Sequence, residues 1–179
     1  MEAGGFGLGS TDVRLLKELP SQMESALSSL PALETRIRRL EAESQIRQLV
    51  ARYCFYIDDR EIDRIGELFT PDARLHSTDG VMNAVGVDAI IDQYHGRFDA
   101  LGPGQHFMHD IQIDFITDTE ANGRVSGHAE LWRNDGMMVA ALRYMDCYQN
   151  GAEGWRIADR EISFLYYVPL ADYPGILGS

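Results

Sequence analysis

The chain has 179 residues, of which 45% are hydrophobic and 25% are charged, so it is long and apolar enough to bury a core. Its 16 Lys and Arg stand against 28 Asp and Glu, which gives a formal net charge of −12. An acidic chain of this kind repels phosphate groups. We therefore expect neither nucleic acid nor an anionic membrane as a partner.

The cysteine content and the longest apolar run both bear on the compartment of the protein. Cys54 and Cys147 are too few for a disulfide scaffold and lack metal-ligand spacing. The longest uninterrupted apolar run, residues 137–142, is too short to span a bilayer or to form the core of a signal peptide. The sequence therefore predicts a cytoplasmic protein.

The amino-terminal third of the chain predicts helices. Residues 1–30 are expected to form a flexible, Gly-rich leader and a short helix over 11–19 that ends at Pro20, before a single domain over 31–179. From Pro31, apolar residues at helical spacing predict a helix to about Asp59. That helix is long for a globular protein, so its first half is expected to pack either on another subunit or on its own domain.

Helices followed by long strands indicate the α+β class. A short helix over 63–69, a hairpin over 73–85 and a third helix beginning near Gly86 are expected, followed by strands over 105–116, 123–133, 137–149 and 155–168. Short connections make successive strands antiparallel. We expect a curved antiparallel sheet wrapped around the helices, an α+β fold with one internal pocket.

The candidate chemical groups do not form a familiar local motif. The chain has no glycine-rich phosphate loop, no dinucleotide fingerprint, no nucleophile elbow and no histidine pair at helical metal spacing, so no metal is expected. Asp58 and Asp59 follow an aromatic run, either as carboxylates that need a donor or as solvated turn formers. Simple alternation places His109, rather than His106, on the apolar face of its strand, and a bulge between them would reverse this.

The other histidines are expected away from the pocket. Alternation in the next strand places His128 on the outer face or at an interface, beside Trp132. His76 and His95 are expected at the surface or in a hairpin instead of in the site.

Four segments together resemble the SnoaL-like family of the nuclear transport factor two-like superfamily. They are LEAESQIRQLVARYCFYIDDREIDRIGELFTPDARL, GVDAIIDQY, QHFMHDIQIDF and GWRIADREISFLYYVPL, and the resemblance covers about residues 33–170. The nearest layouts are those of scytalone dehydratase, the lindane dehydrochlorinase and the bile-acid 7α-dehydratase. The resemblance implies the cone-shaped fold and enzymes without a cofactor that eliminate a small group from a hydrophobic ring substrate.

The resemblance also implies site residues. Asp58 and His106 match the shared catalytic pair, which implies a bulge after His106 and leaves His109 as the alternate base. Tyr53 matches a Tyr of the bile-acid enzyme, and Arg160 matches an Arg of the dehydrochlorinase, so both are catalytic candidates. The candidate substrate-binding residues are Phe55, Leu75, Ala129, Leu131 and Tyr144.

Some positions depart from the relatives. Ala129 stands nearest the second catalytic His of scytalone dehydratase, and Ser77 stands where that enzyme has a pocket Tyr. None of the three specific activities therefore carries over. The expected function is a cofactor-free lyase or isomerase that acts on a hydrophobic cyclic small molecule, with an Asp–His dyad as general base.

Two alternatives share the same fold. One is a non-catalytic module for small-molecule binding or assembly, and the other is the small subunit of a ring-hydroxylating dioxygenase. Because long strands leave an outer sheet face that carries Trp132, we also expect a homodimer or homotrimer.

Overall fold

The structure is a computed structural model that describes residues 10–133 and 136–178. The chain divides into two compact units between Glu41 and Ala42. The described part of the first unit is helical, and the second unit carries the sheet. Residues 1–9 of the predicted leader, and two of the three residues of the turn predicted at 134–136, lie outside the described residues.

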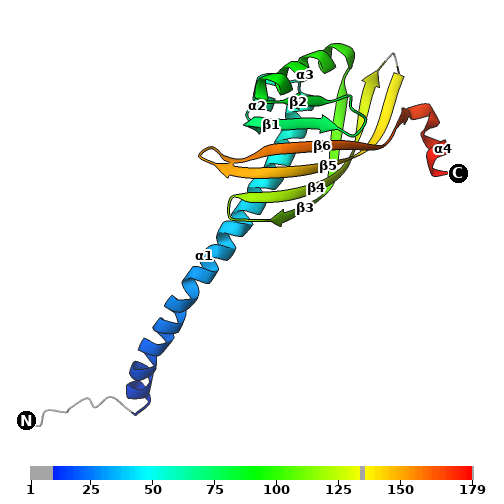
Figure 1. Cartoon of the computed structure of the whole chain (residues 1–179). Coiled ribbons are helices and arrows are strands. Elements are labelled where there is room, and N and C mark those ends of the chain that lie inside the picture. Colours follow the sequence, from blue (N-terminus) through cyan, green and yellow to red (C-terminus); the bar gives the residue numbers. More distant parts are fainter. Residues whose placement is uncertain (1–9, 134–135, 179) are drawn as a thin grey trace, which may run out of the picture. The chain divides into compact units, whose positions relative to one another are not determined.

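Figure 1 shows the helices and strands of the chain. In chain order they are α1 (Ser10–Asp58), α2 (Ile62–Gly66), β1 (Phe69–Ser77), β2 (Asn83–Val85), α3 (Val87–Ala100), β3 (Gly104–Phe115), β4 (Glu120–Arg133), β5 (Gly136–Gly151), β6 (Gly154–Pro169), the 3-10 turn η1 (Leu170–Asp172) and α4 (Tyr173–Leu177).

Helix α1 is continuous where the sequence predicted a stop at Pro20. A proline removes one backbone donor from the helical ladder, but the Leu, Glu, Arg and Ala residues around Pro20 and Pro31 favour the helix strongly. The second compact unit begins at Ala42, within the same helix, whereas the sequence placed the start of the domain at residue 31.

In the second unit, the last turns of α1 supply one stripe of the core. Ile46, Leu49, Tyr53 and Ile57 recur at spacings of three and four residues, and each is at most 8% exposed. The helix ends at Asp58, one residue before the predicted end. Arg60 then turns the chain with a φ of 58°, in the left-handed region.

Helix α2 is shorter than the sequence predicted. It ends at Gly66, and Phe69 and Pro71 belong to β1 instead of the helix. The Phe69 ring is fully buried with its centroid 6.2 Å from that of Tyr53, and Pro71 has no N–H with which to extend a helix. Core packing therefore overrides the local helical pattern of residues 67–69.

The sheet has six strands in the order β2-β1-β6-β5-β4-β3. The four long strands match their predicted positions to within three residues. The expectation of a wholly antiparallel sheet is wrong at one place, because β1 and β6 are parallel. The antiparallel argument applies to strands joined by short connections, and these two are far apart in the sequence. The sheet is curved and not closed, with β2 and β3 as its edges.

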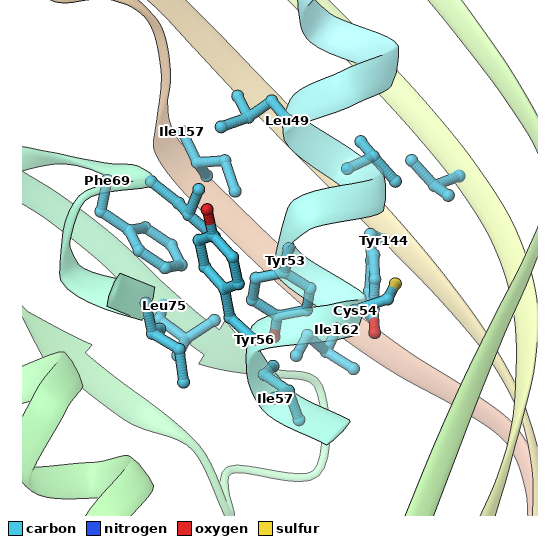
Figure 2. Close-up of a cluster of buried hydrophobic side chains, with 14 of the residues drawn as sticks. Leu49, Tyr53, Cys54, Tyr56, Ile57, Phe69, Leu75, Tyr144, Ile157 and Ile162 are labelled. Atoms are coloured by element: carbon cyan, nitrogen blue, oxygen red, sulfur yellow. The ribbon is translucent and has the colours of Figure 1, made fainter. Parts of the chain in front are cut away.

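The core lies between the sheet and the helices of the second unit. Ile90 and Tyr94 of α3 and Val125 and Tyr144 of the sheet are all at most 2% exposed and belong to one cluster. Strand β4 alternates strictly through its middle, with Val125 and Ala129 buried and Glu130 exposed. The predicted inward face of this strand is therefore confirmed. Figure 2 shows part of the cluster around Tyr53.

A bulge in β3 decides which histidine faces inward. His106 pairs with Ala129 and Met108 with Gly127, but Asp110 pairs with Ser126, so His109 is one extra residue. The partly buried positions therefore change from even to odd numbers at this point. The simple alternation, which placed His109 inward, is wrong, and the bulge implied by the family resemblance is present.

The close packing of Tyr148 on Gly123 generates a stability prediction. A Cβ at Gly123 would collide with the Tyr148 ring, whose hydroxyl is held by Asp146 at 2.5 Å and whose side chain is 1% exposed. We expect Gly123→Ala to lower the free energy of unfolding by about 1–3 kcal/mol, as overpacking does. Gly151→Ala is the matched control, because nothing lies within 4 Å of its Cβ. Urea unfolding of both variants checks this, and equal stabilities would contradict it.

Candidate active site

The end of α1 and the beginning of β3 meet at a buried Asp–His pair. Asp58 Oδ1 lies 2.6 Å from His106 Nδ1, and the backbone N–H of His106 donates to Asp58 Oδ2 at 2.9 Å. The side chains are 8% and 13% exposed, respectively. Both carboxylate oxygens therefore bind one residue, which fixes the position and the ring orientation of His106.

This geometry also selects a tautomer. The carboxylate of Asp58 is an acceptor, so Nδ1 of His106 carries a proton, and in the neutral ring Nε2 then holds the lone pair. His106 lines a cavity, together with Asp58. A neutral imidazole held in this way is able to accept a proton at Nε2, while the carboxylate stabilises the imidazolium that forms.

The cavity lies between α1, α3 and the inner face of the sheet. Its volume is about 60 Å³, whereas one buried water needs roughly 10–15 Å³. Its wall is mostly apolar or aromatic and includes Ala129, Leu131, Leu142, Ile162 and Phe164. A mostly apolar cavity with a few convergent polar groups is typical of a small-molecule site.

Three buried tyrosines add hydroxyl groups to the cavity lining. The hydroxyls of Tyr53 and Tyr94 are hydrogen-bonded to each other, and the Tyr144 ring meets that of Tyr53 edge-on at 5.7 Å (Figure 2). Burial raises the pKa of Tyr53, although Arg160 offsets part of this effect, and burial raises the pKa values of Tyr94 and Tyr144 well above the usual range. These tyrosines therefore stay protonated and are able to donate hydrogen bonds at neutral pH.

Arg160, a catalytic candidate from the resemblance, lies beside the cavity and does not line it. Its guanidinium is fully buried, donates to both carboxylate oxygens of Asp146 at 2.7 and 2.6 Å, and is not among the residues that line the cavity. It lies over the rings of Tyr53 and Tyr144 at 4.1 and 4.3 Å. Arg160 therefore supports the two tyrosines through cation–π contacts instead of reaching a substrate.

The five predicted substrate-binding residues divide into two groups. Ala129, Leu131 and Tyr144 line the cavity. Phe55 is 65% exposed and Leu75 is fully buried in the core, and neither is among the lining residues. Phe55 lies one residue before the buried Tyr56 on α1 and so points away from the core, whereas Leu75 is enclosed within β1.

The remaining histidines lie outside the cavity. His109, the alternate base, is exposed. Its Nε2 lies 2.7 Å from Nδ1 of His128, so His128 lies on the same outer face of the sheet, as predicted. His76 lies in the hairpin of β1 and β2, as expected, where its side chain is 15% exposed and its Nε2 lies 3.2 Å from Asp159, while His95 is exposed.

Sequence reasoning missed the contribution of α3 to the cavity. Tyr94, Arg97 and Phe98 line it, although none of them was among the predicted site residues. The spacing of four residues between Tyr94 and Phe98, both aromatic and on one helical face, is the signal that was present. Within residues 10–133 and 136–178, no group of three His, Cys, Asp or Glu is placed to hold a metal ion.

No helix in the described part of the chain is long and apolar enough to cross a membrane.

Comparison with known proteins gives a family match and a set of similar folds. Residues 38–161 match the SnoaL-like domain family. No curated protein matches the chain.

Two solved structures illustrate the likeness in fold. A scytalone dehydratase candidate from Novosphingobium aromaticivorans DSM 12444 is 20% identical, with a TM-score of 0.68 over 74% of this chain and 90% of that one. The hexachlorocyclohexane dehydrochlorinase LinA-type3 from Novosphingobium barchaimii LL02 is 18% identical, with a TM-score of 0.71 over 76% of this chain and 94% of that one. At these identities the likeness establishes the cone-shaped fold.

The buried ionisable groups predict a loss of stability at alkaline pH. Burial raises the pKa of the Cys54 thiol to about 11, and the pKa values of Tyr53, Tyr94 and Tyr144 are raised too. A raised pKa means that the folded state holds the proton more tightly than the unfolded state does. The contribution of such a group to the free energy of unfolding is complete below the pKa of the unfolded state and is lost as pH rises through the pKa of the folded state. From Cys54 alone, we expect a loss of about 2–3 kcal/mol between pH 9 and pH 11.

Urea unfolding at a series of pH values measures this loss. Cys54→Ala is the control, because it removes the thiol and should flatten part of the decline. A free energy of unfolding that stays constant from pH 8 to pH 11 would contradict the burial of these groups.

Proposed function

Because this chain belongs to the SnoaL-like domain family, we propose that it is a cofactor-free lyase or isomerase that uses Asp58 and His106 as a general-base dyad on a hydrophobic cyclic small molecule. The observation that carries the proposal is the 2.6 Å contact between Asp58 Oδ1 and His106 Nδ1 at the wall of an apolar cavity. The dehydratase and dehydrochlorinase names of similar folds support the same class of reaction.

The proposed first step is removal of a proton from a ring carbon. The lone pair of His106 Nε2 takes the proton, and the electron pair of the C–H bond remains on the substrate, next to a carbonyl or a leaving group. The imidazolium that forms is stabilised by the Asp58 carboxylate at its other nitrogen. The apolar wall limits competing water and strengthens this pairing.

In an elimination, the electron pair then forms a carbon–carbon double bond as the C–O bond to a hydroxyl group breaks. The departing oxygen takes a proton, which the imidazolium supplies, so that water leaves and the neutral dyad is restored. In an isomerisation, the imidazolium returns the proton to a different carbon of the ring. Both routes need the same base, and neither consumes a co-reactant.

The hydroxyl pair of Tyr53 and Tyr94 is the proposed partner for substrate oxygen. Both side chains line the cavity, and they share one hydrogen bond between them. That bond uses one of the two hydroxyl protons and leaves the other for a substrate carbonyl or leaving group. This hydroxyl pair would stabilise negative charge that develops on the substrate oxygen in the transition state, and Arg160 packs on the Tyr53 ring behind it.

Deuterium exchange tests the base without knowledge of the natural substrate. Cyclohexanone, α-tetralone and β-hydroxycyclohexanone, incubated with the protein in D₂O, report proton abstraction as loss of the α-proton NMR signal. β-Hydroxycyclohexanone also reports elimination through the absorbance of cyclohexenone. We expect His106→Ala and Asp58→Asn each to lower the rates by about 10²–10⁴-fold, as for loss of a general base.

His109→Ala is the matched control, because His109 is on the exposed face of the same strand. It should retain the wild-type rate. Far-ultraviolet circular dichroism and thermal unfolding establish that each variant is folded. Rates that survive in His106→Ala would overturn the dyad, and binding of the ketones with neither exchange nor elimination would favour the non-catalytic binding module.

The tyrosine pair gives a separate prediction. Tyr53→Phe and Tyr94→Phe should each lower elimination from β-hydroxycyclohexanone by about 10²–10³-fold, the usual cost of losing one donor to a developing oxyanion. Tyr56→Phe is the control on the same helix, since the Tyr56 hydroxyl is bonded to Arg64 and does not line the cavity. If all three variants retain equal activity, the hydroxyl pair has no role in the reaction.

A further inference from the structure

The first unit of the chain carries a stripe of exposed apolar side chains. Along α1, Met23 is 61% exposed, Leu30 46%, Leu33 45%, Ile37 54% and Leu40 65%. Large aliphatic side chains exposed in one continuous row are costly in water and usually mark an interaction surface. The stripe is therefore a candidate for contact with another helix.

The spacing of this stripe is a heptad repeat. Positions a are Leu16, Met23, Leu30 and Ile37, and positions d are Leu19, Ala26, Leu33 and Leu40. Four consecutive heptads with apolar a and d positions are typical of a coiled coil. The repeat ends where the second unit begins, since the next a and d positions are Ser44 and Arg47.

We infer that residues 16–40 form a parallel, two-stranded coiled coil with the same segment of a second copy of this chain. The flanking charges favour this occupant. Arg36 is at position g and Glu41 is at the following position e, which are the positions that meet between the two helices of a parallel pair. Within the described residues, neither side chain forms an ion pair in its own chain.

The residues at the seam also favour two strands. Ile37 at position a, with Leu33 and Leu40 at position d, is the combination that favours a dimer over a trimer. Pro31 is at position b, on the side of the helix away from the seam, so its ring does not enter the interface. An antiparallel pair would lose the attraction between positions g and e, which is why the parallel arrangement is favoured.

Cysteine crosslinking in the full-length protein tests both the contact and its direction. Cys147→Ser removes the exposed native thiol, and Ala26→Cys or Leu40→Cys is then introduced at a d position. These two positions are 14 residues apart along the chain, or about 21 Å along a helix. In a parallel, in-register pair each variant crosslinks to its own copy under mild oxidation.

Ser28→Cys and Thr35→Cys, at the outward f positions, are the matched controls. We expect at least tenfold faster formation of the covalent dimer from residues 26 and 40 than from residues 28 and 35. Dimer formation only in a mixture of the 26 and 40 variants would show an antiparallel pair and overturn the inference. Equal rates at the d and f positions would overturn the contact itself.

A charge swap provides an independent measurement. In sedimentation analysis, Arg36→Glu should raise the dissociation constant of the dimer about tenfold, because two attractions become repulsions. Combining Arg36→Glu with Glu41→Arg should restore the wild-type value. A monomeric or trimeric wild-type chain, or a double variant as weak as the single one, would contradict the parallel two-stranded arrangement.

Discussion

The carboxylate of Asp58 is the contact on which the candidate site depends. One oxygen accepts the backbone N–H of His106 and the other accepts the ring Nδ1–H, so the last residue of α1 is joined to the start of β3 at two points. The same carboxylate therefore joins the two elements and places the proton of the histidine on Nδ1. An asparagine there keeps an acceptor but presents its N–H₂ to a donor, so the backbone and the ring lose their shared partner.

Two further features shape the cavity around that contact. Because of the bulge at His109, the side chains of His106 and Met108 face inward before it and that of Ile111 faces inward after it. Deeper in the core, the pair of Arg160 and Asp146 is fully buried. Its desolvation is costly, and the guanidinium is compensated by two hydrogen bonds and by two tyrosine rings. The Arg160 guanidinium in turn packs on the rings of Tyr53 and Tyr144 and so helps to position their hydroxyls in the cavity.

Much of the fold follows from local sequence patterns. Alternation and turn residues placed the four long strands, helical spacing placed the end of α1, and the family resemblance brought Asp58 and His106 together. The parallel pairing of β1 with β6 and the full burial of Arg160 were missed, because each depends on partners far away in the sequence. The bulge at His109 also has no local signal, since residues 105–113 alternate equally well without it.

The protonation state of His106 tests the central claim most directly. In ¹⁵N NMR of histidine-labelled protein at pH 8, the account predicts that His106 carries its proton on Nδ1 and that Nε2 is unprotonated, because Asp58 accepts from Nδ1. Asp58→Asn should shift or broaden this signal, while His109→Ala should leave it unchanged. A His106 signal with the proton on Nε2, or one insensitive to Asp58→Asn, would contradict the dyad.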